Sequence, residues 1–174
     1  TKEEVKKVVV ETVRRNGLRD AHIRPILARG VGAPGLDPNR CPRASLIVMA
    51  YPFPPILGEK PVKLLTSSVK RKSPHSVDSK IKSLNYLDNI LANMQSSAVG
   101  CDDAIMLDVN GLVAEGTGEN IFFVKNGVIY TPTTVAALHG ITRATIMEIA
   151  ADLGYKTVEK DITIQELYSA DEVF

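Results

Sequence analysis

Two glutamates, Glu115 and Glu119, lie among small residues directly before a run of apolar and aromatic side chains. The stretch over residues 113–124 reads VAEGTGENIFFV. A pair of carboxylates can serve as acid and base in glycoside hydrolysis. Four residues apart in a turn, the two side chains need not face each other, and a glutamate beside a hairpin is usually solvated. The pair by itself therefore does not identify a hydrolase.

A second group combines a lysine, a carboxylate and a helix start. Lys80 and Lys82 lie where a loop is expected to enter a helix, and Gly140 begins a second expected helix through Ile141 and Thr142. Two solvated lysines would be the ordinary interpretation. Together with Glu115, however, these residues supply the three attachments that pyridoxal phosphate requires. The sequence therefore points to that cofactor.

Each attachment has a chemical reason. An amine is needed to form the cofactor's imine and to move a proton afterwards. A carboxylate facing the pyridine nitrogen keeps that nitrogen protonated, so that the ring withdraws electrons from the substrate. A helix amino end offers unpaired N–H groups and a favourable dipole to a phosphate.

The segment Gly30-Val-Gly-Ala-Pro-Gly35 has the G-x-G-x-x-G spacing of a dinucleotide site. That fingerprint needs a helix to begin inside the glycine turn. Pro34 and the following Leu-Asp-Pro sequence favour an irregular loop instead. We therefore expect no dinucleotide site here.

Composition favours small-molecule chemistry. The 174 residues include 21 basic and 20 acidic side chains, for a net charge of +1, with 44% hydrophobic residues. No basic stripe indicates nucleic acid, and no apolar run is long enough for a membrane helix. The amino end also lacks the order of regions found in a signal peptide, so we expect a cytoplasmic protein. Cys41 and Cys101 have no metal-ligand spacing, which predicts reduced thiols and no metal site.

Local patterns predict the elements that position these residues. Thr1 and Glu4 resemble a capping box for a helix ending near residue 16. Strand-like runs follow at 21–29, 45–50 and 62–69, and apolar residues recur at helical spacing over 83–98. Asn110-Gly111 and Asn126-Gly127 predict two successive hairpins in an antiparallel sheet. A helix from Ile141 to Leu153, a strand over 156–162 and a short helix over 165–169 complete the chain.

From Ala21 onward the chain resembles the fold-type IV aminotransferases, most closely the branched-chain amino acid aminotransferases. The resemblance rests on Ile23-Arg-Pro25, Lys82-Ser-Leu-Asn-Tyr86, Glu115-Gly-Thr-Gly-Glu-Asn-Ile-Phe122, Leu138-His-Gly-Ile-Thr-Arg143 and Leu167-Tyr-Ser-Ala-Asp-Glu-Val-Phe174. It implies an α+β fold of two domains. We expect residues 1–55 to form part of the smaller domain, 56–61 a linker, and 62–174 the larger, cofactor-binding domain.

The resemblance also implies a role for each matching residue. Lys82 matches the Schiff-base lysine, and Lys80 fits the pattern less well. Tyr86 matches the residue that binds the cofactor's phenolic oxygen, and Glu115 the partner of the pyridinium nitrogen. The remaining matches are Leu138 on the ring face, Ile141 and Thr142 at the phosphate, and Arg24 at the distal carboxylate of glutamate.

The implied reaction moves the amino group of leucine, isoleucine or valine to 2-oxoglutarate, in a homodimer or an assembly of dimers. A D-amino-acid aminotransferase, an aminodeoxychorismate lyase and a non-catalytic domain of the same fold stay open as alternatives. His22 departs from the tyrosine usual in the family, which bears on substrate preference. Relatives also carry residues before Thr1 and a Gly-Thr-Ala turn after Phe174, so we expect the sequence to be a fragment.

Overall fold

The computed structural model describes residues 1–52 and 60–174. The chain divides into two compact units, Thr1–Glu59 and Lys60–Phe174. Most of the predicted linker, 56–61, lies outside the described residues, so the predicted domain limits remain a prediction. Within the described ranges, no helix has the length and apolar character needed to cross a membrane.

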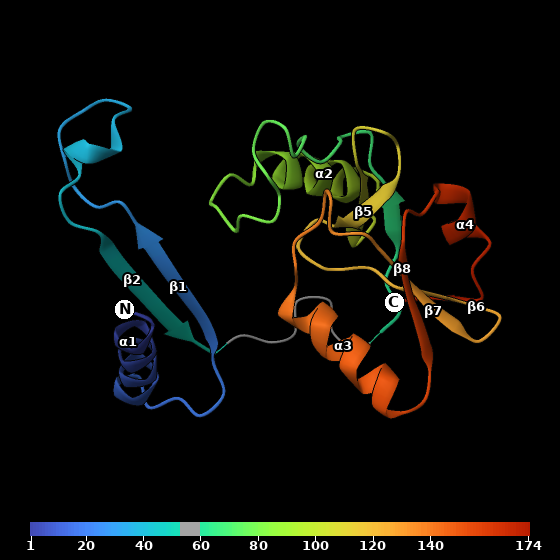
Figure 1. Ribbon diagram of the computed structural model, residues 1–174, viewed down its shortest axis with the longest axis horizontal. Helices are drawn as coiled ribbons and strands as arrows, with labels where there is room; N and C mark the ends of the chain where they lie inside the picture. Colours follow the sequence, from blue (N-terminus) through green and yellow to red (C-terminus); the bar gives the residue numbers. More distant parts are fainter. Residues whose placement is uncertain (53–59) are drawn as a thin grey trace. The chain divides into compact units, whose positions relative to one another are not determined.

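The first unit is a helix and a two-stranded sheet (Figure 1). Helix α1 (Lys2–Arg15) begins at Thr1, whose side chain forms the predicted capping box with Glu4. Strands β1 (His22–Ala28) and β2 (Ser45–Tyr51) pair antiparallel, and α1 packs against both. The glycine-rich stretch between the strands contains only a three-residue 3₁₀ helix, η1 (Pro38–Arg40), so no α-helix begins in the G-x-G-x-x-G turn.

The second unit has two sheets. One has the order β3-β4-β5 and the other β8-β7-β6-β9. Their bounds are β3 Leu64–Thr66, β4 Asp103–Leu107, β5 Val113–Gly116, β6 Phe123–Lys125, β7 Val128–Pro132, β8 Lys156–Lys160 and β9 Glu172–Val173. Both predicted hairpins form, as β4–β5 and β6–β7. The expected single antiparallel sheet is wrong, because each hairpin lies in its own sheet and gains a parallel neighbour, β3 or β8.

Three helices complete this unit: α2 (Leu87–Ala98), α3 (Ile141–Asp152) and α4 (Ile164–Tyr168). Helix α2 begins four residues later than the predicted 83, and Leu84, which the periodicity placed on the helix, is 62% exposed in the preceding loop. The principal core cluster comprises Ile105, Leu107, Val113, Ile121, Phe123, Ile162 and Leu167. Strand β5, which carries Glu115, thus has its apolar side chain Val113 in that core.

Candidate active site

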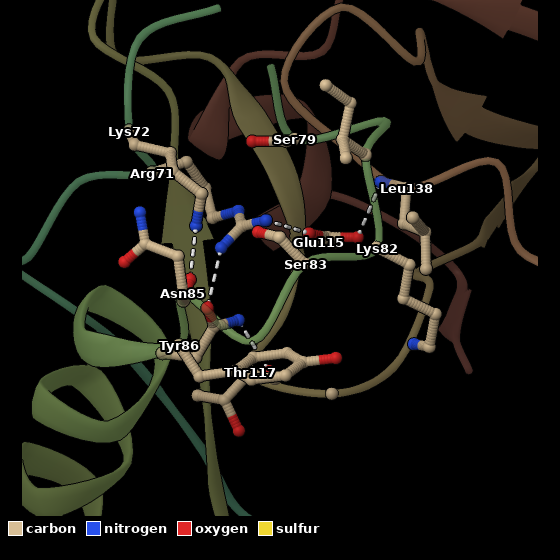
Figure 2. Close-up of a pocket in the computed structure, with 13 residues that line it drawn as sticks. Arg71, Lys72, Ser79, Lys82, Ser83, Asn85, Tyr86, Glu115, Thr117 and Leu138 are labelled. Carbon is tan, nitrogen blue, oxygen red and sulfur yellow. Dashed lines mark hydrogen bonds and ion pairs between the residues drawn. The ribbon is translucent and has the colours of Figure 1, made fainter. Parts of the chain in front are cut away.

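Glu115 is a buried carboxylate at the carboxyl end of β5, with 6% of its surface exposed. Figure 2 shows it between Arg71 and Leu138. Nη2 of Arg71 lies 2.7 Å from Oε1 of Glu115, and the backbone N–H of Leu138 donates to Oε2 at 3.0 Å. Burial raises the pKa of Glu115, and the Leu138 hydrogen bond and the Arg71 charge act in the opposite direction. Each carboxylate oxygen retains capacity for a further donor.

Lys82 and Tyr86 come from the loop that precedes α2. The loop turns tightly, since Ser83 donates its backbone N–H to the Ile81 carbonyl at 2.7 Å. Nζ of Lys72 binds the Asn85 carbonyl at 2.8 Å and so fixes the end of the loop. The Lys82 side chain is exposed and extends away from Glu115 (Figure 2). Lys80, the other candidate, forms an ion pair with Asp78 at 3.3 Å.

Two hollows adjoin these residues. The first, which we call the inner pocket, is lined by residues that include Arg71, Lys82, Tyr86, Glu115 and Leu138. The second, which we call the helix-end cavity, has a volume of about 610 Å³ and is lined by residues that include Lys80, Lys82, Phe122, Leu138, Thr142 and Phe174. Lys82, Gly118 and Leu138 line both. The two hollows therefore share a wall.

The amino end of α3 opens into the helix-end cavity. Gly140, Ile141 and Thr142 line the cavity, and Gly140 caps the helix without any side-chain hydrogen bond. The first N–H groups of a helix have no partner within the helix. The dipole and these donors together favour an anion at such a position.

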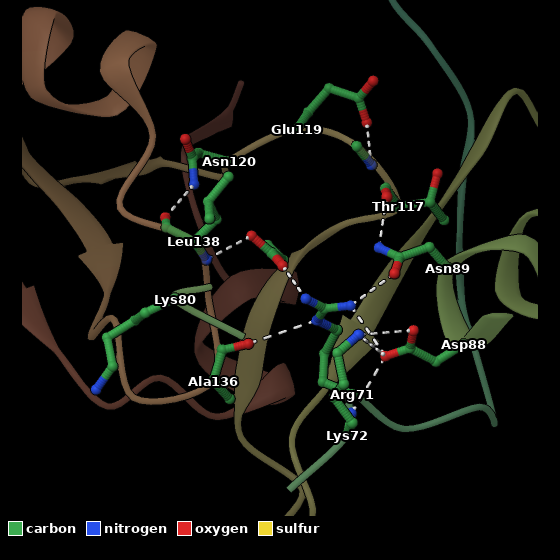
Figure 3. Close-up of polar contacts among 12 residues, drawn as sticks. Arg71, Lys72, Lys80, Asp88, Asn89, Thr117, Glu119, Asn120, Ala136 and Leu138 are labelled. Atoms are coloured by element: carbon green, nitrogen blue, oxygen red, sulfur yellow. Dashed lines mark hydrogen bonds and ion pairs between the residues drawn. The ribbon is translucent and has the colours of Figure 1, made fainter. Parts of the chain in front are cut away.

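Asn120 holds the segment that leads to α3. Its Nδ2 donates to the Leu138 carbonyl at 3.2 Å (Figure 3). Gly140 lies so close that a Cβ atom there would stand 1.9 Å from Oδ1 of Asn120. Glu115 binds the N–H of the same Leu138. The segment over 115–120 therefore binds the residues before α3 through both the N–H and the carbonyl of Leu138.

Glu119 belongs to a separate pair. Its pKa is raised to about 7, by burial and then by the hydrogen bond and charge of Asp103. Burial also acts to raise the pKa of Asp103, but hydrogen bonds from Glu119 and Thr117 lower it overall. Glu119 therefore holds its proton to a higher pH than an ordinary glutamate, whereas Asp103 stays charged. Glu115 and Glu119 have different partners, and nothing in this arrangement favours glycoside hydrolysis.

The structure brings together six of the seven residues selected from the sequence. Lys82, Tyr86, Glu115 and Leu138 line the inner pocket, and Ile141 and Thr142 join Lys82 and Leu138 around the helix-end cavity. Arg24 is exposed on β1 opposite Met49, in the other unit. Its predicted contact with substrate stays a prediction.

Sequence reasoning missed Arg71 and its partners Asp88 and Asn89. Arg71 is 5% exposed and is followed by Lys72. A run of basic residues directly after an apolar strand was the available signal. It carried no information about burial, because runs of charged residues are usually solvated.

Comparison with known proteins assigns the family. The family model for class IV amino-transferases matches residues 1–174. The chain belongs to the class IV aminotransferases. The match covers the whole chain and includes both units. The predicted family and α+β fold class are thereby confirmed.

Individual class IV relatives agree with this assignment. A putative branched-chain-amino-acid aminotransferase of Methanocaldococcus jannaschii is 47% identical over 100% of this chain and 61% of its own length. The crystal structure of a T.th. branched-chain amino acid aminotransferase complexed with N-(5′-phosphopyridoxyl)-L-glutamate has a TM-score of 0.91 at 41% identity, covering 100% of this chain and 57% of that chain. A putative 4-amino-4-deoxychorismate lyase of Legionella pneumophila has a TM-score of 0.88 at 29% identity, covering 97% and 62%. The chain thus spans about three fifths of these relatives.

Proposed function

We propose that the protein acts as a pyridoxal 5′-phosphate-dependent branched-chain amino acid aminotransferase, moving the amino group of leucine, isoleucine or valine to 2-oxoglutarate. The observation that carries the proposal is the meeting of an amine, a buried carboxylate and an uncapped helix end around two adjoining hollows. The similarity to the M. jannaschii and T.th. proteins supports the same choice of reaction and cofactor.

The residues present fit the cofactor on their donor and acceptor chemistry. The Lys82 side chain is exposed and lines both hollows, and no hydrogen bond or ion pair within residues 1–52 and 60–174 engages its amine. The amine is therefore available for covalent attachment. Glu115 has unused acceptor capacity towards a pyridinium N–H. The α3 amino end has no side-chain cap to compete with a phosphate.

When bound, pyridoxal phosphate supplies an electron sink for the negative charge that develops at the substrate α-carbon. Lys82 would hold the cofactor and, as the placed base, would move the α-proton. Tyr86 would donate to the cofactor's phenolic oxygen, and Glu115 would pair with its ring nitrogen. Leu138 would lie against the ring, and the Ile141 N–H and Thr142 hydroxyl would bind the phosphate. Arg24 would receive the distal carboxylate of glutamate.

Replacement of Lys82 tests the proposal. We expect Lys82→Ala to abolish the visible absorption band of the cofactor-loaded protein and to reduce turnover by about 10²- to 10⁴-fold or more, since proton transfer by a placed base contributes that much. Lys80→Ala, two residues away, is the matched control and should keep the band. Loss of the band in Lys80→Ala alone would show that Lys80, and not Lys82, attaches the cofactor.

A lyase acting on aminodeoxychorismate is the second candidate, because the Legionella protein has the same fold at lower identity. Steady-state assays with L-leucine, D-alanine and aminodeoxychorismate distinguish the candidates. We expect turnover with L-leucine and 2-oxoglutarate. Activity confined to D-alanine or to release of pyruvate from aminodeoxychorismate would reassign the reaction. Absence of any band in the protein mixed with cofactor would favour a non-catalytic domain. The cytoplasmic location and the homodimeric assembly stay predictions.

A further inference from the structure

Arg71 is the most completely partnered charged residue next to Glu115. Its Nη1 lies 2.9 Å from Oδ2 of Asp88 and donates to Oδ1 of Asn89 at 2.8 Å. Nε donates to the Ala136 carbonyl at 3.4 Å, and Nη2 lies 2.7 Å from Glu115. Three nitrogens of one planar group are thus bound by three separate parts of the chain. The guanidinium cannot rotate without breaking several of these contacts.

These contacts extend into a chain of hydrogen bonds that returns to the loop carrying Glu115 (Figure 3). Nδ2 of Asn89 donates to the Thr117 carbonyl at 2.6 Å, so Asn89 links Arg71 to the loop two residues beyond Glu115. Helix α2 therefore fixes both the loop and the arginine. The direction from which Arg71 meets Oε1 of Glu115 is set by α2.

Arg71 is the positive group that most directly stabilises the negative charge of Glu115. Among the residues that the structure describes, Arg71, Lys72 and Lys82 are the positive groups that act on it. Lys72 forms an ion pair with Asp88, with its Nζ 3.1 Å from Oδ1, and Lys82 is exposed to solvent. On the negative side, Glu119 interacts with Glu115, and Asp88 is bound by both Arg71 and Lys72. Of these three positive groups, Arg71 is the one that is both buried and in direct contact with the carboxylate.

A buried carboxylate loses hydration, which favours its neutral form. A neutral Glu115 would offer a pyridinium no opposite charge, and its own proton would occupy one of its lone pairs. An arginine stays charged at any physiological pH, so its positive charge continuously favours the ionised form of the buried carboxylate. Nη2 of Arg71 occupies one lone pair of Oε1 and the Leu138 N–H occupies one of Oε2, so only the remaining lone pairs of Glu115 are open to a further donor.

We propose that Arg71 is a positioning residue for the reaction: it orients the Glu115 carboxylate and keeps it ionised, ready for the ring nitrogen of the cofactor. This role rests on the proposed function. Asn89 supports it by holding the guanidinium against the loop.

The test is a carboxyl ¹³C NMR titration of Glu115 in the full chain without cofactor. We expect Arg71→Met to raise the titration midpoint of Glu115 by about 1 to 3 pH units, since a close opposite charge lowers a carboxyl pKa by that amount. Lys72→Met also removes one nearby positive charge and is the matched control. We expect it to change the titration midpoint of Glu115 by less than half as much as Arg71→Met. Equal changes in the two variants, or none in Arg71→Met, would overturn the proposal.

Arg71→Lys keeps the positive charge but removes the planar guanidinium group. This variant tests the proposal if Arg71→Met does not fold. We expect it to recover most of the titration midpoint but not the wild-type amide shift of Leu138, which reports carboxylate orientation. A wild-type titration midpoint together with a wild-type Leu138 amide shift would show that the guanidinium group has no positioning role.

A second measurement separates this proposal from the proposed function. In the cofactor-loaded protein, Arg71→Lys should reduce kcat by about 10-fold or more with little change in KM, and should have no further effect in a Glu115→Gln background. Additive effects would mean that Arg71 acts independently of Glu115. If the wild-type chain shows no cofactor band, the proposed function fails, while the apo titration still reports the Arg71–Glu115 coupling.

Discussion

At the scale of single residues, the two glutamates of one loop differ in the charge of their partners. Glu115 faces the positive Arg71, whereas Glu119 faces the negative Asp103. A carboxylate beside a cation is stabilised in its charged form, and one beside another carboxylate holds its proton. Environment therefore separates two side chains that look alike in the sequence.

The Glu119–Asp103 pair predicts a pH dependence of stability. The folded pKa of Glu119 is about 7, above its ordinary value of 4.5. Between these two values the folded state binds more protons than the unfolded state, so the Glu119 contribution is present below about pH 4.5 and lost as the pH rises through 7. Asp103 acts in the other direction only at lower pH, because its folded pKa is below its ordinary 3.8.

We therefore expect Glu119→Gln to lessen the fall in the free energy of unfolding between pH 5 and 8, by about 1 to 2 kcal/mol after allowance for partial exposure. Urea unfolding at both pH values measures this change. Glu148→Gln, at an exposed position on α3, is the control. A pH dependence that is the same in wild type and Glu119→Gln would contradict the raised pKa of Glu119.

At the scale of elements, α3 depends on a neighbouring loop for the position of its amino end. Gly140 has no room for a side chain, because Asn120 occupies the space. Asn120 also binds the Leu138 carbonyl. The absence of a side-chain cap at α3 is thus compatible with a well-placed helix start.

A Gly140→Ala substitution tests this packing. We expect it to weaken cofactor binding by about 10-fold or more, because the new methyl group displaces the start of α3, and a shift costing 1.4 kcal/mol is tenfold in affinity. Spectrophotometric titration with pyridoxal phosphate gives the affinity. Asn120→Ala in the Gly140→Ala background removes the clash and should recover part of the loss. If the double variant binds as weakly as the sum of both single effects, the clash is not the cause.

At the scale of the whole molecule, the chain consists of two units, and all described residues around the inner pocket and the helix-end cavity belong to the second. Arg24 belongs to the first unit. The proposed function gives it the distal carboxylate of glutamate, which leucine lacks. We therefore expect the first unit, through Arg24, to affect the selectivity between glutamate and leucine.

We predict that Arg24→Met raises the KM for glutamate and 2-oxoglutarate by about 10- to 100-fold, the loss expected for one charge-assisted hydrogen bond. The KM for leucine should change much less. Arg29→Met, at the other end of the same hairpin, is the control, since Arg29 binds the Pro38 carbonyl at 2.6 Å. Equal losses for leucine and glutamate in Arg24→Met would remove Arg24 from substrate recognition.

The sequence by itself determined the features that have local causes. The capping box at Thr1 and Glu4 needs only neighbours along the chain, and the Asn126-Gly127 turn follows from two residues that tolerate positive φ, here 51° and 74°. Motifs of a few neighbouring residues also gave the residues proposed to bind the cofactor, such as Lys82, Glu115 and Thr142, and their roles stay proposals.

Tertiary structure decided the features that depend on distant contacts. Helix α2 begins at Leu87 rather than at 83. Asp88 in its first turn binds Arg71 and Lys72, and Lys72 also binds the carbonyl of Asn85 just before the helix. The pairing of each hairpin with a parallel strand joins segments that hydropathy alone cannot match. Burial of Arg71 against Glu115 likewise joins residues far apart in sequence. An arginine is favourable in the interior only when charged partners surround it, and those partners are assembled by folding.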